Sequence, residues 1–184
     1  MSPKALSRSF STVPRALWIG MLLNLLLFNA VQAGEPGTKL DTLETQLREE
    51  VIALHDFFVG WYNASMPESA FDTEFMARLD NGFTIIMPSG VTLDHQTLVS
   101  SMHRSYGKKP GFHIEIRNVR LLQATGSIVV AQYEEWQHNK QESPGVGSGR
   151  ISTVIFSLGD KLQWLHVHET WLPEDIVQAD DFDF

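Results

Sequence analysis

The chain has 184 residues, a formal net charge of −8 at pH 7, and no cysteine. This length suits a single domain. The lack of cysteine excludes disulfides, thiolate nucleophiles and cysteine-based zinc sites. An acidic surface repels phosphate backbones, so we expect the protein to bind no nucleic acid.

The first 33 residues have the pattern of a secretory signal peptide. Lys4, Arg8 and Arg15 precede an apolar run over residues 16–31, and small residues follow at the cleavage position. We therefore expect removal of residues 1–33 and a secreted or periplasmic protein. One alternative is an uncleaved membrane anchor, for which the apolar run is of borderline length, since a spanning helix needs roughly 20 apolar residues. Such an anchor would be the protein's only contact with a membrane. Another is a mitochondrial import sequence.

Helices are expected to follow a short linker at residues 34–39. Apolar residues recur every three or four positions over 40–62, which predicts a long amphipathic helix. A shorter helix is expected over 67–79, with proline at its start. A third is expected over 95–106, with Asp94 as its N-cap.

Strands account for most of the remaining chain. A first strand is expected near residue 83 and four long ones after residue 111, with spans of 83–87, 112–123, 128–138, 149–158 and 161–172. A phase shift in the alternation within 112–123 indicates a β-bulge. Residues 174–184 form an acidic tail that we expect to fray. The fold class is therefore α+β, a cone of three N-terminal helices packed on a strongly curved antiparallel sheet, which leaves room for a cavity.

The last strand carries polar side chains on both of its faces. His166 and His168 share one face, while Leu165, Val167 and Glu169 share the other. In this phase Glu169 lies in line with core residues and points into the cone. A strand flipped by one residue would instead place the histidines in the pocket and Glu169 on the surface.

A carboxylate inside such a cone would be desolvated. Its pKa would rise unless a cation pairs with it, and Arg117, Arg150 and His113 are the available partners. Two readings stay open: a pocket carboxylate that binds or protonates a ligand, and a structural ion pair near the rim.

The paired histidines also raise the possibility of metal binding. His166 and His168 lie two apart and could hold one ion, with a third ligand from His113 or His138. In the alternative reading they face solvent or a partner subunit. We expect no metal and no cofactor.

Residues 40–173 resemble the nuclear transport factor 2-like (NTF2-like, or cystatin-like) superfamily, and within it the SnoaL-like or domain of unknown function 4440 group. The resemblance rests on the order of three segments, Gly60-Trp-Tyr-Asn63, Ile86-Met-Pro88-Ser-Gly90 and Trp164-Leu-His-Val-His-Glu-Thr170. It implies a homodimer and a pocket whose mouth lies near Trp61 and Tyr62. It implies no single chemistry, because members include isomerases, cyclases, dehydratases and many non-enzymatic domains.

Comparison with ketosteroid isomerase, a member of this superfamily, is the sharpest test of an enzymatic function. That enzyme's catalytic Asp precedes a proline, where this chain has Met87, and its oxyanion tyrosine corresponds to a position near Phe58. Neither side chain can move a proton. We therefore do not expect that activity.

Three functional hypotheses follow. The first is a non-catalytic module that binds a small apolar molecule, oriented by Tyr62, Arg150 and Glu169. The second is a cofactor-independent isomerase, dehydratase or cyclase, which an open pocket with Glu169 near a histidine or arginine would favour. The third is a dimeric assembly domain whose exposed sheet face bears Trp164, His166 and His168.

Overall fold

The computed structural model describes residues 36–142 and 145–184. The expected signal peptide, with its alternatives, lies outside these residues. Within the described part, no helix is long and apolar enough to cross a membrane.

Helices and helical turns make up the N-terminal half of the domain. The elements are α1 (Pro36–Tyr62), the π-helical turn η1 (Phe71–Phe75), the 3-10 turn η2 (Met76–Arg78) and α2 (His95–Arg104). The first helix begins inside the segment predicted as a linker. The predicted second helix is wrong in type, because the π turn and the 3-10 turn replace a regular helix there. The predicted N-cap is confirmed: the side chain of Asp94 accepts a hydrogen bond from the backbone of Thr97.

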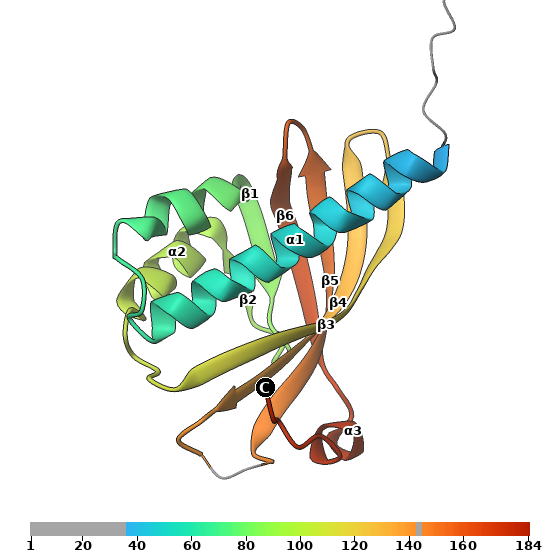
Figure 1. The fold of residues 1–184 in the computed structure, drawn as a ribbon. Coiled ribbons are helices and arrows are strands. Elements are labelled where there is room, and N and C mark those ends of the chain that lie inside the picture. Colours follow the sequence, from blue (N-terminus) through green and yellow to red (C-terminus); the bar gives the residue numbers. More distant parts are fainter. Residues whose placement is uncertain (1–35, 143–144) are drawn as a thin grey trace, which may run out of the picture. The chain divides into compact units, whose positions relative to one another are not determined.

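Six strands form one sheet in the order β2-β1-β6-β5-β4-β3. Their bounds are β1 (Leu79–Ile86), β2 (Thr92–Asp94), β3 (Phe112–Thr125), β4 (Ile128–Asn139), β5 (Gly147–Leu158) and β6 (Leu162–Trp171). The α+β class is confirmed, but the sheet is mixed, since β1 and β6 are parallel. Figure 1 shows α1 lying diagonally over the sheet, with β1, β2 and α2 near its C-terminal half.

A bulge bends β3, as its sequence predicted. The pairing of β3 with β4 shifts between Arg117 and Arg120, and Asn118 has a positive φ of 54°. Such a bulge increases the local bend and twist of a strand. It lets β3 follow α1, with which it makes extensive contact.

A second bulge, in β6, was not predicted. Phe156 pairs with Trp164 and Ile155 pairs with His166, so Leu165 is an extra residue between them. The alternation therefore changes phase, and Trp164, not Leu165, points into the core, where it is 1% exposed. This corrects the assembly hypothesis, because the surface it proposed cannot include Trp164.

The core fills the space between α1, the helical turns and one face of the sheet. Aromatic rings dominate its centre, with Phe57 stacked on both Trp61 and Phe75. Offset and edge contacts of this kind add to the free energy gained from burying apolar area. The buried hydrophobic side chains of α1 recur at helical spacing, and they are Leu43, Leu47, Val51, Leu54, Phe57 and Trp61.

The acidic tail does not fray as predicted. After the short helix α3 (Glu174–Gln178), Asp180 forms an ion pair with Arg117 and Phe182 is 5% exposed. The ring of Phe182 packs on Trp136. The tail thus covers part of the sheet face opposite α1. The sequence signal for this docking was an apolar residue, Phe182, within an acidic segment.

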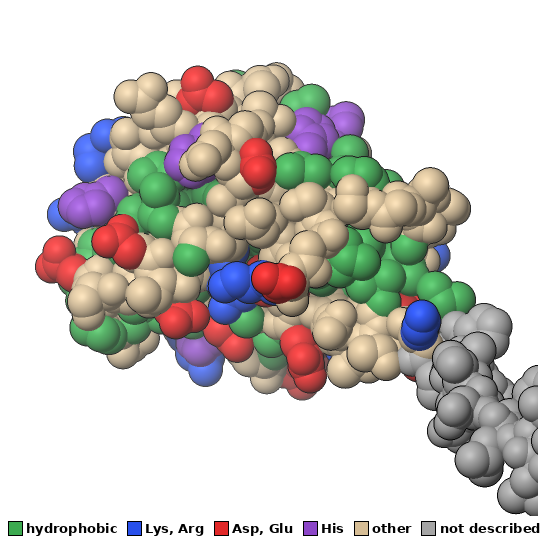
Figure 2. Space-filling view, turned by 90° about the horizontal axis from the view of Figure 1, so that it is seen from above, with side chains coloured by type: hydrophobic (Ala, Val, Ile, Leu, Met, Phe, Trp, Pro, Cys, Tyr) green, Lys and Arg blue, Asp and Glu red, His purple; other side chains and the backbone are tan. Residues whose placement is uncertain are grey.

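Charges are mixed on the surface of the domain. On the face shown in Figure 2, acidic, basic and histidine side chains lie singly or in small groups between apolar patches. This mixture differs from the continuous basic footprint of proteins that bind phosphate backbones.

Candidate functional site

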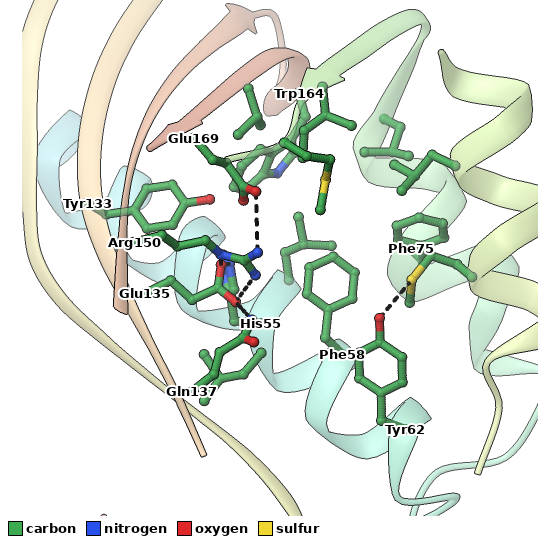
Figure 3. Close-up of a pocket in the computed structure, with 18 of the residues that line it drawn as sticks. His55, Phe58, Tyr62, Phe75, Tyr133, Glu135, Gln137, Arg150, Trp164 and Glu169 are labelled. Carbon is green, nitrogen blue, oxygen red and sulfur yellow. Dashed lines mark hydrogen bonds and ion pairs between the residues drawn. The ribbon is translucent and has the colours of Figure 1, made fainter. Parts of the chain in front are cut away.

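A cavity of about 180 Å³ lies between α1, α2 and the sheet. Most of its wall is apolar, and one side is polar (Figure 3). The apolar lining consists of Leu54, Phe58, Phe75, Leu79, Phe83, Ile85, Met87, Leu98, Met102, Phe112, Ile114, Trp164 and Val167.

The polar wall is built around one arginine. Arg150 binds Glu135 through two hydrogen bonds, Nε to Oε2 at 3.0 Å and Nη2 to Oε1 at 2.5 Å. Its Nη1 also donates to Oε2 of Glu169 at 3.3 Å. Glu135 and Glu169 are only 2% and 5% exposed, so Arg150 compensates two buried carboxyl groups.

The two carboxyl groups titrate in opposite directions. Burial raises the pKa of Glu169 to about 7, although Arg150 partly offsets this effect. Burial would also raise the pKa of Glu135, but the charges and hydrogen bonds of Arg150 and His55 outweigh it and hold that pKa well below its usual range. Glu135 is therefore a fixed anion, whereas Glu169 can carry a proton near neutral pH.

His55 supports the cluster from α1. Its Nδ1 lies 2.6 Å from the carbonyl oxygen of Val51, and its Nε2 lies 3.2 Å from Oε2 of Glu135. Both partners are acceptors, so each ring nitrogen already faces a hydrogen-bond partner and neither is free for a ligand.

Strand register places these groups side by side. Glu135 on β4 is directly opposite Arg150 on β5. Glu169 on β6 is opposite Ser152, two residues along β5 from Arg150 and on the same face of that strand. The polar wall is therefore a row across three neighbouring strands.

The lining of the cavity includes an exposed residue, Lys109, where the cavity reaches the surface. The Lys109 ammonium lies 4.4 Å from the ring centre of Tyr62 and 4.8 Å from that of Phe112. Partial burial lowers the pKa of Lys109. The Tyr62 hydroxyl points to the sulfur of Met102, at 3.4 Å (Figure 3).

Three of the predicted site residues line this cavity: Tyr62, Arg150 and Glu169. The structure shows the phase in which Glu169 faces inward. Trp61 does not line the cavity. It is buried in the core, where it is 1% exposed and its indole donates to the carbonyl of Met102.

The other four predicted site residues lie away from the cavity. The ring of His113 lies 5.5 Å from that of His138, tilted by 34°, and Arg117 pairs with Glu115 and Asp180 beside the tail. His166 and His168 project from the opposite face of β6 to Glu169, since neighbouring side chains of a strand point to opposite faces. His166 is held there by the hydroxyl of Thr84, at 2.8 Å.

Sequence reasoning missed two members of the polar wall, Glu135 and His55. A signal existed for both of them. Glu135 alternates in phase with Tyr133, which is buried, and His55 directly follows Leu54 on the apolar side of a helix. In each case a polar residue in an apolar pattern marked a buried, hydrogen-bonded group.

The cavity lining also includes the two residues that stand at the catalytic positions of ketosteroid isomerase and that cannot move a proton. Met87 and Phe58 both contribute to its lining. Across residues 36–142 and 145–184, no three histidine, aspartate or glutamate side chains are grouped so that they could hold a metal ion.

Solved structures with the same fold include an NTF2-like protein and a protein with a cystatin-like fold. An NTF2-like protein of unknown function from Pseudomonas aeruginosa is 27% identical, with a TM-score of 0.60, and the match covers 71% of this chain and 98% of that one. An uncharacterised cystatin-like protein from Caulobacter vibrioides is 12% identical, with a TM-score of 0.51, covering 74% and 94%. The fold is that of the NTF2-like superfamily, as the resemblance implied. The narrower SnoaL-like or domain of unknown function 4440 grouping stays a prediction.

Sequence comparison gives the family. The profile of the sucrose-6-phosphate phosphohydrolase C-terminal family matches residues 47–173, so the chain belongs to that family. Sucrose-phosphatase 2 of Nicotiana tabacum is 27% identical over an alignment of 131 residues. The alignment covers 67% of this chain and 30% of that protein. A probable sucrose-phosphatase 2 of Arabidopsis thaliana is 24% identical over 136 residues, 71% of this chain and 31% of that protein. The chain thus spans about a third of the length of the curated relatives it matches.

Proposed function

We propose that this domain binds a small, largely apolar molecule in the cavity and orients it by a hydrogen bond to Glu169. The observation that carries this proposal is the single partly satisfied carboxyl group on the cavity wall. Only Oε2 of Glu169 is engaged by a described side chain, at 3.3 Å from Arg150. Its other oxygen remains available to a ligand.

The shape and lining of the cavity support binding of this kind. Ligand pockets are mostly apolar with a few converging polar groups, and this cavity has that composition. Its volume of about 180 Å³ is below the roughly 300–1,000 Å³ of pockets for drug-sized ligands, which favours a smaller molecule.

The other polar groups on the wall hold each other. Arg150 is shared by two carboxyl groups, and His55 contacts acceptors with both nitrogens. A ligand that displaced either one would leave a buried charge unpaired, at a high cost in free energy. Glu169 is therefore the group best suited to meet a ligand.

A second candidate function is catalysis without a cofactor. The observation that favours it is the pKa of Glu169 of about 7, beside an Arg150 within hydrogen-bond reach. A carboxyl group with that pKa can serve as a general acid or base near neutral pH. We place binding first because the cavity offers one such group and not a pair.

The proposal does not extend to the activity named for the curated relatives. Those names describe proteins of which the chain matches about 30%.

Secretion and a homodimer also belong to the proposal. Their support is the charged and apolar pattern of residues 1–33 and the dimerisation implied by the superfamily. Native mass spectrometry of the protein purified from its own host tests both. It should give a dimer that starts near residue 34 and carries a small molecule.

Binding itself is testable with two probes that differ by one hydroxyl group, benzyl alcohol and toluene. The methyl groups of Met87 and Met102 line the cavity, so their carbon-13 NMR signals report occupancy. Benzyl alcohol should bind more tightly than toluene, and Glu169→Leu should lower the benzyl alcohol affinity by about 3- to 10-fold, the value of one hydrogen bond. Toluene should bind the variant at least as well as the wild type.

The matched control is Glu174→Leu, which changes an exposed carboxylate on α3 in the same way. It should leave both affinities unchanged. If neither probe shifts the Met87 and Met102 signals, or if Glu169→Leu weakens both probes equally, the proposed role of Glu169 is wrong.

A further inference from the structure

We infer that the ligand of this cavity is a small organic anion, with its apolar body inside and its anionic group, a carboxylate or a phosphate, at the mouth beside Lys109. This inference deepens the proposed function and rests on it. Three features of the mouth carry it.

The first feature is that Lys109 has no counter-ion. Its ammonium lies over the faces of the Tyr62 and Phe112 rings. Within residues 36–142 and 145–184 no carboxylate forms an ion pair with it, although the charge of Glu135 acts on it from further away. Arg78, Arg117 and Arg150, by contrast, each form an ion pair with at least one carboxylate. A cation held over two rings can bind an anion without breaking an existing pair.

The second feature is that the backbone fixes Lys109 in place. Its N–H donates to the carbonyl of Tyr62 at 3.0 Å. Two residues on, the N–H of Gly111 donates to the side chain of Asn63 at 2.7 Å, and Asn63 in turn donates to the carbonyl of Phe112 at 2.8 Å. The loop is therefore tied to the end of α1, so the cation is positioned before a ligand arrives.

The third feature is that the cavity opens into a polar groove at this point. The cavity and the groove share Lys109, Phe112 and Gln137 as lining residues. The groove also has Lys108 beside it and a carboxylate, Glu142, further along. An anionic group can thus stay partly in water at Lys109 while the apolar part of the ligand is buried.

The polar wall makes the opposite orientation unfavourable. An anion at the inner end would approach Glu135, which is a permanent anion, and Glu169, which is one above about pH 7. Arg150 is already bound to both of them. A hydroxyl group at Glu169 and an anion at Lys109 satisfy both ends of the cavity.

The test compares 6-hydroxyhexanoate with 1,6-hexanediol, which differ in charge at one end only. Binding is followed at pH 6.5 through the Met87 and Met102 methyl signals. The wild type should bind the carboxylate about 3- to 10-fold more tightly than the diol, as expected for a charge-assisted contact that is partly exposed to solvent. Added salt should reduce this preference.

The variant Lys109→Met should abolish the preference for the carboxylate while keeping an apolar stem over Tyr62 and Phe112. Lys109→Arg should retain the preference. Lys161→Met removes the same charge from an exposed residue that lines neither the cavity nor the groove, and it should leave the preference intact.

The outcomes separate this inference from the proposed function. Equal affinity for the two probes, or a preference that survives in Lys109→Met, overturns the inference and leaves the cavity as a site for neutral ligands. If neither probe shifts the two methionine signals, both the proposed function and this inference fail.

Discussion

Glu135 and Glu169 share one cation, Arg150, yet they are held in different protonation states. Arg150 gives Glu135 a two-point contact and gives Glu169 a single contact of 3.3 Å. The stronger contact keeps Glu135 charged, and burial of Glu169 raises its pKa to about 7. A row of three side chains thus supplies one structural ion pair and one carboxyl group that is able to titrate.

The raised pKa of Glu169 predicts how stability depends on pH. The folded protein holds this proton more tightly than the unfolded chain, whose pKa is near 4.5. The contribution of Glu169 to stability is therefore complete below about pH 4.5 and is lost as the pH rises to about 7. The loss should be about 2–3 kcal/mol.

Urea unfolding at several pH values between 4.5 and 7.5 measures this slope. Glu169→Gln should flatten it, because the amide does not titrate. Glu174→Gln, on the exposed side of α3, should leave it as in the wild type. An identical slope in the Glu169→Gln protein would mean that another group causes it.

Removing the shared cation should destabilise the fold strongly. Arg150→Met removes the shared cation from two buried carboxyl groups and leaves only Glu135 with another partner, His55, which costs about 3–5 kcal/mol in unfolding free energy. Chemical unfolding at pH 7 measures the loss, and the variant should recover part of its stability at lower pH as Glu169 becomes fully protonated.

Arg117→Met is the matched control for Arg150→Met. Arg117 pairs with Glu115 and Asp180 in a partly exposed position, so its loss should cost only about 1 kcal/mol. Equal losses from the two variants would show that the cavity cluster has no special energetic role.

The docked tail should contribute to stability. Phe182 fills a space next to Gly147, where an added Cβ would lie 2.3 Å from the Phe182 ring. Phe182→Ala should lower the unfolding free energy by about 2–4 kcal/mol. Gly147→Val should have an effect of the same sign, because the added side chain would clash with the ring and with the backbone oxygen of Gln137.

Asp183→Ala is the control for the tail, since Asp183 is exposed. It should change the unfolding free energy by no more than about 0.5 kcal/mol. A wild-type unfolding curve for Phe182→Ala would mean that the tail is not docked in solution.

Local patterns were sufficient to predict most of the fold. The 3.6-residue period over 40–62, the N-cap Asp94 and the phase shift near Asn118 each arise from interactions between close neighbours in sequence. The parallel pairing of β1 with β6 has no such local signal. It joins Thr84 to His166, which are 82 residues apart in the sequence. Pairing between residues so far apart in the chain depends on how the whole chain packs.

The site was predicted only where a local pattern marks it. The alternation of β6 near its end placed Glu169 on the inner face, and Arg150 was named among its partners. The bulge at Leu165 was missed because it depends on pairing with β5. Glu135 and His55 were missed because their contact spans 80 residues.

The most direct test of the account is a crystal structure of the protein soaked in benzyl alcohol. We predict the ring inside the cavity, in contact with Phe58 and Phe75, and the hydroxyl group within hydrogen-bond distance of Glu169. A cavity without the alcohol at saturating concentration, or an alcohol whose hydroxyl group points away from Glu169, would contradict the proposed role of this carboxyl group.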